Sequence, residues 1–198
     1  MSNVSKIKKI AITGSIGSGK STVSRYIRSK GFEVFDSDAF VHWLYREHED
    51  LKNQIIMHFD HEMIEDDQVD TTKLRNFLIE HPDRRHQLES MVHPLVLDGF
   101  EQFVKNAKQD IVFAEVPLLF EAGWEKYFDQ TWFVYADHDI IVDRLMLDRQ
   151  IDEETLKSMM SWQMDPAKKS AMSSTILYNN KQVDSLYLQV DQALDKLK

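Results

Sequence analysis

The stretch that decides the fold reads GSIGSGKS at residues 14–21, which fits the phosphate-loop pattern G-x-x-x-x-G-K-S without a mismatch. Residues 7–13 (IKKIAIT) end in a β-branched apolar run, as a buried strand does. Residues 22–30 (TVSRYIRSK) carry apolar side chains at helical spacing, and Gly31 follows where a helix would end. A strand, a glycine loop and a helix in this order indicate a site for the phosphates of a nucleoside triphosphate.

Each residue type in the loop suits phosphate binding. Glycine lets backbone N–H groups approach phosphate oxygens, and the following helix directs its positive end at them. Lys20 can reach the β- and γ-phosphates, and the Ser21 hydroxyl can help to hold Mg²⁺. We therefore expect ATP to be bound by Gly14, Ser15, Ile16, Gly17, Ser18, Gly19, Lys20, Ser21 and Thr22.

The composition of the 198-residue chain is that of a globular protein, with 42% hydrophobic and 29% charged residues. The formal net charge of −9 argues against a nucleic-acid partner. The chain has no cysteine, which excludes disulfides and thiolate metal sites. The polar start MSNVSKIKK lacks the apolar segment of a secretion signal, and no apolar run is long enough to span a bilayer. We expect a cytoplasmic protein without a membrane partner.

Strand and helix patterns alternate at both ends of the chain. Beyond the first strand and helix, we expect strands at residues 32–35, 111–116, 131–135 and 175–178, and helices at 139–150, 152–163 and 183–197. Residues 39–107 show no convincing strand and predict successive helices at 39–47, 51–59, 72–79 and 83–104.

This order of elements predicts an α/β P-loop NTPase fold, in which three α/β/α layers contain a five-stranded parallel sheet, with a helical insertion and a lid. The insertion is too long for a simple crossover, so we expect it to hold a substrate. The predicted parts are a nucleotide-binding core (residues 1–38, 108–138 and 171–198), a helical substrate domain (39–107) and a lid (139–170).

Three polar side chains fall at the carboxyl ends of expected strands, where such folds bind ligands: Thr13, Asp36 and Glu115. In a kinase, a carboxylate at this edge can orient the acceptor hydroxyl and take its proton. Asp36-Ser37-Asp38 can also be ordinary capping chemistry before a helix. The position beside the phosphate loop favours Asp36 as the base and Asp38 as the N-cap.

Two arginines, Arg144 and Arg149, lie five residues apart on the expected helix at 139–150. Arginine on a mobile lid can grip phosphate oxygens and stabilise the charge that develops during phosphoryl transfer. Alternatively, the two are exposed partners of Asp143 and Asp148. The sequence leaves both interpretations open.

Further segments make the chain resemble the dephospho-CoA kinases, a family of P-loop kinases. Residues 36–38 (DSD) stand where this family has D-A-D, and residues 116–121 (VPLLFE) match its P-L-L-F-E signature. Its L-R, L-E and H-P pairs are matched by Leu74-Arg75, Leu88-Glu89 and His93-Pro94. Its lid and last-strand pattern is matched by Arg144, Arg149, Gln163 and Asn179. The resemblance covers nearly the whole chain.

The resemblance implies ATP-dependent phosphorylation of the ribose 3′-hydroxyl of dephospho-CoA, the last step of coenzyme A synthesis, by a monomer or small homo-oligomer. It places Lys20, Asp36 and Arg144 in catalysis, and Arg149 and Asn179 beside ATP. The helical domain becomes the CoA-substrate domain, and the dephospho-CoA contacts are Asp36, Asp38, Arg75, His93, Pro117 and Leu118. Mg²⁺ is expected at Ser21 and Glu115.

The chain departs from the family pattern at positions outside the phosphate loop and the lid arginines. The family commonly has aspartate at Glu115, arginine at Thr71, glycine at Asp60, glutamine at Ile141 and Ala-Asp at Ser173-Ser174. These differences concern contacts with adenine and CoA rather than the reaction.

Two other functions fit parts of the sequence. One is a P-loop kinase for a nucleoside monophosphate, shikimate or gluconate, because only the insertion sets the acceptor; the VPLLFE and His-Pro segments favour dephospho-CoA. The other is a non-catalytic ATP-binding regulator, which is expected to lack Lys20, Ser21 or Asp36. All three are present.

Overall fold

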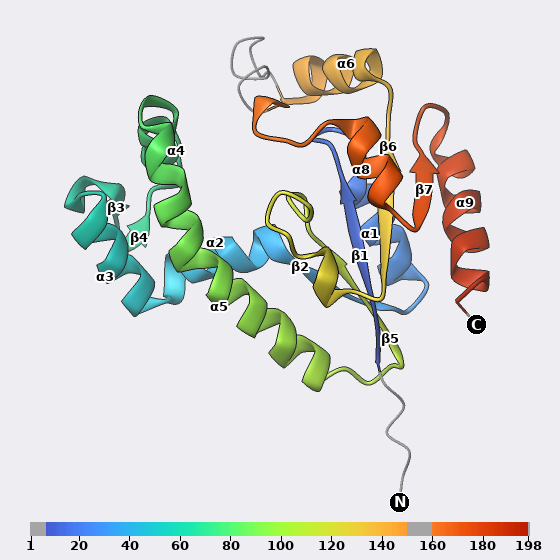
Figure 1. The fold of residues 1–198 in the computed structure, drawn as a ribbon, viewed down its shortest axis with the longest axis horizontal. Helices are drawn as coiled ribbons and strands as arrows, with labels where there is room; N and C mark the ends of the chain where they lie inside the picture. The colour runs from blue at the N-terminus through green and yellow to red at the C-terminus, as the bar shows by residue number, and fades with distance from the viewer. Residues whose placement is uncertain (1–6, 150–159, 198) are drawn as a thin grey trace, which may run out of the picture. The chain divides into compact units, whose positions relative to one another are not determined.

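The computed structural model describes residues 7–149 and 160–197, without the side chains of residues 147–149. Of these, residues 7–36, 107–149 and 160–197 belong to one compact unit, and residues 37–106 form a second. The first unit contains β1 (Lys8–Gly14), α1 (Lys20–Ser29), β2 (Glu33–Asp36), β5 (Ile111–Glu115), β6 (Gln130–Tyr135), α6 (His138–Arg149), α8 (Pro166–Met172), β7 (Thr175–Tyr178) and α9 (Val183–Asp195) (Figure 1). The second contains α2 (Ser37–Glu47), α3 (Glu49–His58), β3 (Ile64–Glu65), β4 (Gln68–Val69), α4 (Thr71–Glu80) and α5 (Arg85–Lys105). Short 3₁₀ turns lie at His61–Met63, Pro82–Arg84 and Glu125–Tyr127.

The first unit is built on a five-stranded parallel sheet with the strand order β2-β5-β1-β6-β7. The central strands β1, β5 and β6 are buried along most of their length. Such strands read as continuous apolar runs because helices cover the sheet. This confirms the predicted α/β fold with a five-stranded parallel sheet.

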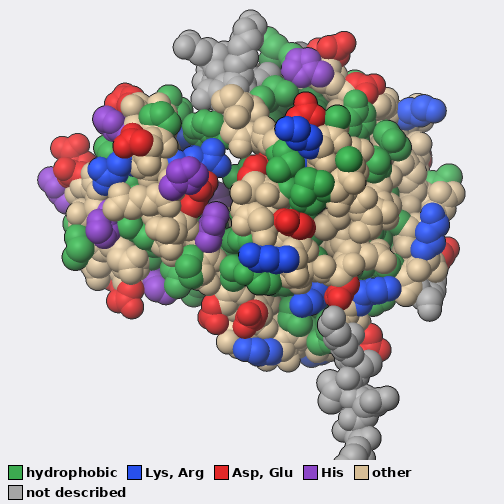
Figure 2. Space-filling model, viewed as in Figure 1, with side chains coloured by type: hydrophobic (Ala, Val, Ile, Leu, Met, Phe, Trp, Pro, Cys, Tyr) green, Lys and Arg blue, Asp and Glu red, His purple; other side chains and the backbone are tan. Residues whose placement is uncertain are grey.

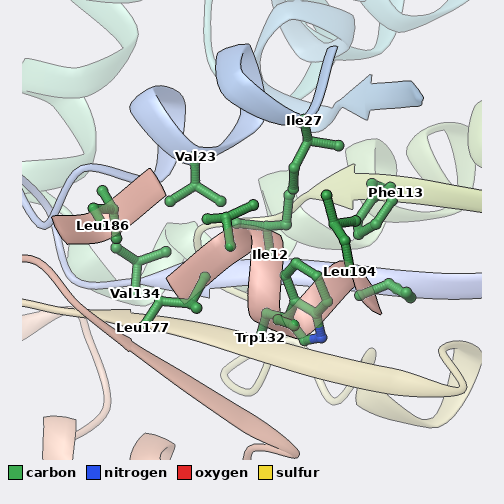
Figure 3. Packing of buried hydrophobic residues seen from close by; sticks show 12 residues of the cluster. Ile12, Val23, Ile27, Phe113, Trp132, Val134, Leu177, Leu186 and Leu194 are labelled. Carbon is green, nitrogen blue, oxygen red and sulfur yellow. The ribbon is translucent and has the colours of Figure 1, made fainter. Parts of the chain in front are cut away.

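Helices α1 and α9 pack together on the sheet, and their apolar side chains meet those of the strands (Figure 3). Val23 and Ile27 of α1 are fully buried, as is Trp132 of β6. Burying an aliphatic or aromatic side chain of this size contributes about 1.5–3 kcal/mol. The cluster therefore fixes β1 against α1, and the loop between these two elements is held at both ends.

The second unit contains a two-stranded antiparallel sheet, so the prediction that residues 39–107 have no strand is wrong. Ile64 of β3 pairs with Val69 of β4. The turn residues Asp66 and Asp67 have φ of 48° and 61°, the conformation that a tight two-residue hairpin requires. Strands of two residues are too short to show an alternation of apolar and polar side chains. The turn is formed by Asp-Asp, whereas Asn-Gly is the usual sequence signal for such a turn.

Several helix boundaries differ from the predicted ones. Helix α1 begins at Lys20 instead of Thr22, which brings the lysine into the first turn. Helix α2 begins at Ser37, so Asp38 lies inside its first turn and the N-cap prediction for Asp38 is wrong. A carboxylate there still favours the positive end of the helix. Residues 150–159 of the predicted lid helices lie outside the described residues.

Helix α8 was not predicted. Its N-cap is Asp165, whose Oδ1 accepts hydrogen bonds from Ala167 N at 2.8 Å and Lys168 N at 3.2 Å. Pro166 occupies the first helical position, where its missing N–H costs nothing. The Asp-Pro pair was the available sequence signal for this helix.

Asp60 is the described position where the backbone conformation fits the residue least. Its φ of 149° and ψ of 157° belong to a region that glycine adopts and other residues avoid. Asp60 Oδ1 accepts a hydrogen bond from Glu62 N at 3.0 Å, which offsets part of this cost.

We predict that Asp60→Gly raises the free energy of unfolding by about 1 kcal/mol, because relief of strain outweighs the loss of the cap. Asp60→Ala loses the cap and keeps the strain, so it should lower stability. Urea unfolding of both variants and the wild type checks this, and a destabilised glycine variant would contradict it.

The negative charge is divided unevenly between the two units. Residues 37–106 carry fifteen acidic and seven basic side chains, a formal charge of −8, which leaves −1 for the rest of the chain. Figure 2 shows acidic and basic side chains interspersed over the face that it draws. None of the helices in the described ranges is both long and apolar enough to cross a bilayer. An anionic ligand of the second unit therefore needs individual basic side chains.

Candidate active site

The phosphate loop joins the buried end of β1 to α1 through residues whose conformation requires glycine. Gly17 and Gly19 have φ of 70° and 99°. A Cβ on Gly19 would lie 2.2 Å from Asn179 Nδ2, and a Cβ on Gly17 would lie 3.0 Å from a carbon of Leu145. Both positions thus need glycine for conformation and for space. The loop has the compact shape in which backbone N–H groups can surround a phosphate.

The Lys20 side chain is folded over this loop. Its Nζ donates hydrogen bonds to Gly14 O and Ser15 O, each at 3.0 Å, and the residue is only 9% exposed. The ammonium group is therefore held beside the loop backbone by two carbonyls. A positive charge fixed in this position suits the β- and γ-phosphates of a nucleotide.

Three side chains from the C-terminal part of the chain hold the loop from outside. Asn179 Nδ2 donates to Ser18 O at 2.8 Å. Arg144 donates from its two terminal nitrogens to Gly17 O at 3.4 Å and Asn179 O at 3.0 Å. Gln163 Oε1 accepts from Ile16 N at 3.1 Å. The loop after β7, helix α6 and residue 163 are thus joined to the phosphate loop, although about 120 to 160 residues separate them along the chain.

Two carboxylates stand in one row of the sheet, close to the loop. Asp36 at the end of β2 pairs in register with Glu115 at the end of β5, and Glu115 pairs with Ile12 of β1. Glu115 is 8% exposed, whereas the Asp36 side chain is 35% exposed. Arg28 lies 3.9 Å from Asp36 Oδ2, which is a long and half-exposed ion pair. Such a pair contributes little stability. Because its side chain is 35% exposed, the Asp36 carboxylate is accessible at the carboxyl edge of the sheet.

The predicted metal ligands offer the oxygen donors that Mg²⁺ prefers. Ser21 is in the first turn of α1, directly after Lys20, and Glu115 supplies a nearly buried carboxylate from the neighbouring strand. Mg²⁺ in kinases is commonly held by one or two protein oxygens together with phosphates and water. A hydroxyl and one carboxylate fit this pattern.

The P-L-L-F-E segment continues β5 and is joined to β1. Thr13 Oγ1 donates to Pro117 O at 3.2 Å, and Val116 N donates to Ile12 O at 2.9 Å. Leu119 is fully buried, whereas Pro117 and Leu118 are half-buried. The backbone of Pro117 is therefore fixed beside the strand that leads into the phosphate loop.

Arg75 differs from the other lysines and arginines of the second unit, because its side chain is available to bind a ligand. Residues 37–106 are all described, and Arg75 is the one basic side chain among them that forms no hydrogen bond or ion pair with another described residue. It is exposed on α4. Glu89 of the same unit is already paired, because it binds Arg85 Nε at 2.7 Å and His86 Nδ1 at 3.1 Å.

His93 is on α5, two turns after Arg85 and one turn after Glu89. Its partial burial lowers the pKa of the imidazole, and Arg85 acts in the same direction, while the charge of Glu89 opposes both. The ring is therefore biased toward its neutral form, which can accept or donate a hydrogen bond. The backbone of Arg149 ends α6, but its side chain lies outside the described residues.

Comparison with known proteins gives one consistent result. A family model described as dephospho-CoA kinase matches residues 8–185. A dephospho-CoA kinase of Streptococcus pneumoniae is 34% identical over 191 residues, which cover 95% of this chain and 95% of that protein. The corresponding protein of Oceanobacillus iheyensis is 33% identical, with 94% and 96% covered.

Solved structures agree with this at the level of the fold. A crystal structure of a Thermus thermophilus protein covers 98% of this chain and 99% of its own, with a TM-score of 0.85 and 30% identity. A dephospho-CoA kinase from Campylobacter jejuni, covering 96% of each chain, has a TM-score of 0.70 at 20% identity. A shikimate kinase from Acinetobacter baumannii, covering 98% and 94%, scores 0.55 at 15% identity, which concerns the fold alone.

Proposed function

Because the chain belongs to the dephospho-CoA kinase family, we propose that its phosphate loop and the carboxylate of Asp36 transfer the γ-phosphoryl group of ATP to the ribose 3′-hydroxyl of dephospho-CoA. The chain is a kinase, and the family's reaction is the last step of coenzyme A synthesis. The observation that carries the site assignment is the glycine-dependent loop with the Lys20 ammonium group folded over it.

The chemistry assigned to the residues follows from their positions. Lys20 and the loop backbone bind the phosphates of ATP, and Thr22 follows in the same turn of α1. Asp36 accepts the proton of the 3′-hydroxyl while the hydroxyl oxygen attacks the γ-phosphorus. The bond from the γ-phosphorus to the bridging oxygen breaks, and ADP leaves with the electron pair. Mg²⁺, held by Ser21 and Glu115, would neutralise phosphate charge during this step.

The acceptor can be tested with a coupled assay for ADP release. Dephospho-CoA, adenylate and shikimate are compared at equal concentrations with the purified chain. We expect a kcat/KM for dephospho-CoA at least about 100-fold above the other two, because sites that hydrogen-bond their substrate can reject analogues without the matching groups by about 10⁴–10⁵. Higher activity with adenylate or shikimate would assign the chain to another acceptor.

The lid arginine gives a second test. Arg144 bridges two backbone carbonyls, and its fork can turn to the transferring phosphoryl group when ATP is bound. Arg144→Ala should lower kcat by roughly 100-fold or more, with ATP still bound by the loop. Arg144→Lys should recover little, because one ammonium group cannot replace the fork. Arg149→Ala is expected to lower kcat less than Arg144→Ala. Full activity in the Arg144→Ala/Arg149→Ala double variant would refute the catalytic roles of both arginines.

We assign the acceptor to the helical unit, where Arg75 is proposed to bind the pyrophosphate of dephospho-CoA. Arg75→Ala should raise the KM for dephospho-CoA by about tenfold, the effect of losing one charge-assisted contact, and leave the KM for ATP unchanged. Lys105→Ala, which removes an exposed base paired with Glu101 in the same unit, is the control. An equal rise in both KM values for Arg75→Ala would indicate a structural role instead.

The remaining parts of the proposal rest on family membership and composition. Asp38, His93, Pro117 and Leu118 are assigned to dephospho-CoA, and Asn179 to ATP. The division into nucleotide core (1–38, 108–138, 171–198), CoA domain (39–107) and lid (139–170) follows from these assignments. We place the enzyme in the cytoplasm, as a monomer or small homo-oligomer.

A further inference from the structure

Glu121, the last residue of the P-L-L-F-E segment, holds two parts of the chain with one carboxylate oxygen. Its Oε1 accepts a hydrogen bond from Met164 N at 2.7 Å and lies 2.7 Å from Lys169 Nζ. The Lys169 side chain on α8 is fully buried and that of Glu121 is 15% exposed. Breaking a buried ion pair by removing one partner is strongly destabilising, because it leaves the other charge buried and unpaired. Glu121 therefore sets the position of the chain from residue 164 to residue 169.

The residue beside Met164 binds the phosphate loop. Gln163 Oε1 accepts the hydrogen bond from Ile16 N at 3.1 Å, and Gln163 N donates to Met160 O at 3.0 Å. The side chains of Ile16 and Met160 pack against the same apolar cluster, which includes Ile141 and Leu145 of α6. Glu121 thus holds the backbone at Met164, and the side chain of the neighbouring Gln163 holds the phosphate loop at Ile16.

The segment that carries Glu121 is itself fixed. Pro117 O accepts from Thr13 Oγ1, and Trp124 N donates to Leu119 O at 2.9 Å. Leu119 and Phe120 are 0% and 5% exposed. Glu121 therefore projects from a rigid base, and a displacement of residues 163–164 is opposed by the core.

We propose that Glu121 is a positioning residue for ATP binding, which acts through Met164 and Gln163 to keep Ile16 and the phosphate loop in the conformation that binds phosphate. The inference deepens the proposed function, since it takes the loop as the ATP site, but it does not depend on which acceptor is phosphorylated. Glu121 touches no reacting atom in this scheme.

Single substitutions at Glu121 cannot test the proposal, because removing one partner leaves the other charge buried and unpaired, which is strongly destabilising. Replacing both partners removes this complication. Glu121→Gln with Lys169→Met keeps an oxygen that can accept from Met164 N. Glu121→Ala with Lys169→Met loses that acceptor together with the rest of the side chain beyond Cβ.

The measurement is the Kd of Mg-ATP without acceptor, by titration calorimetry, for chains whose Tm lies well above the assay temperature. We expect the Ala/Met variant to bind ATP about tenfold more weakly than the wild type, the effect of losing one buried hydrogen bond. The Gln/Met variant should stay within about twofold. Gln163→Ala alone should reproduce the tenfold loss, and adding it to the Ala/Met variant should cause no further loss.

Several results would overturn the proposal. These are equal Kd values for the Gln/Met and Ala/Met variants, a further tenfold loss on adding Gln163→Ala to the Ala/Met variant, or wild-type affinity in Gln163→Ala. The last result decides the matter even where the double variants do not fold. A wild-type chain that binds ATP but does not phosphorylate dephospho-CoA would contradict the proposed acceptor and leave this inference standing.

Discussion

Lys20→Ala should lower phosphoryl transfer by more than about 10³-fold while the protein remains folded. The substitution removes the positive charge that the structure holds beside the loop backbone, at 3.0 Å from Gly14 O and Ser15 O. That charge is worth most in the transition state, where negative charge moves from the γ-phosphoryl group toward the β-phosphate. The loss should therefore appear in kcat as well as in ATP binding.

The matched control is Lys168→Ala, which removes an exposed lysine on α8. Circular dichroism and Tm should be alike for the two variants, and the control should keep wild-type turnover. Near-normal turnover in a folded Lys20→Ala chain would contradict the kinase mechanism itself, since Lys20 is the lysine that the structure holds on the carbonyls of the loop.

Asp36→Asn is expected to lower kcat by about 10²–10⁴-fold, the usual contribution of a general base. The amide keeps the size of the carboxylate but cannot take the proton of the acceptor hydroxyl. The KM for ATP should change little, because Asp36 is assigned to the acceptor side. Steady-state kinetics with each substrate varied separately measures both quantities.

Two controls separate the role of Asp36 from structural ones. Arg28→Ala removes the long ion pair with Asp36, and it should leave kcat within about threefold, because an exposed pair contributes little. Asp38→Asn should cost less than Asp36→Asn. A loss in Arg28→Ala as large as that in Asp36→Asn would mean that the pair positions the strand end. If Asp38→Asn lowered kcat more than Asp36→Asn, the roles assigned to the two aspartates would have to be exchanged.

The parts of the fold that could be predicted from the sequence are those marked by a short local motif or by a regular pattern of apolar residues. The motif at residues 14–21, with an apolar strand before it and a helical pattern after it, predicted the loop that joins β1 to α1. Buried parallel strands such as β5 and β6 were recognisable as apolar runs. The five-stranded sheet and the family were confirmed; the roles of the site residues stay predictions.

What the sequence did not reveal depends on weak turn signals or on distant contacts. The β3–β4 hairpin has two residues a strand and an Asp-Asp turn, and neither produces a periodic pattern. Gln163 and Glu121 were recognised as part of a family pattern, but their contacts with Ile16 and Met164 span 147 and 43 residues. No local propensity reports such a contact; only the folded backbone brings the partners together.

Asp60 illustrates the opposite case, in which the family pattern carried structural information. The family commonly has glycine there, and the structure gives the aspartate a φ of 149°. The departure therefore has a physical cost at a turn of the helical unit. Ile141, where the family commonly has glutamine, is 3% exposed and belongs to the apolar cluster against which Ile16 packs.

The central claim is transfer of the γ-phosphoryl group to one hydroxyl of dephospho-CoA, and the product reports on it most directly. Purified chain, Mg-ATP and dephospho-CoA are incubated, and the products are assigned by two-dimensional ³¹P–¹H correlation. We predict a new phosphomonoester coupled to the ribose 3′ proton, formed in equal amount to ADP. ADP without a phosphomonoester, or a phosphate on another hydroxyl, would contradict it.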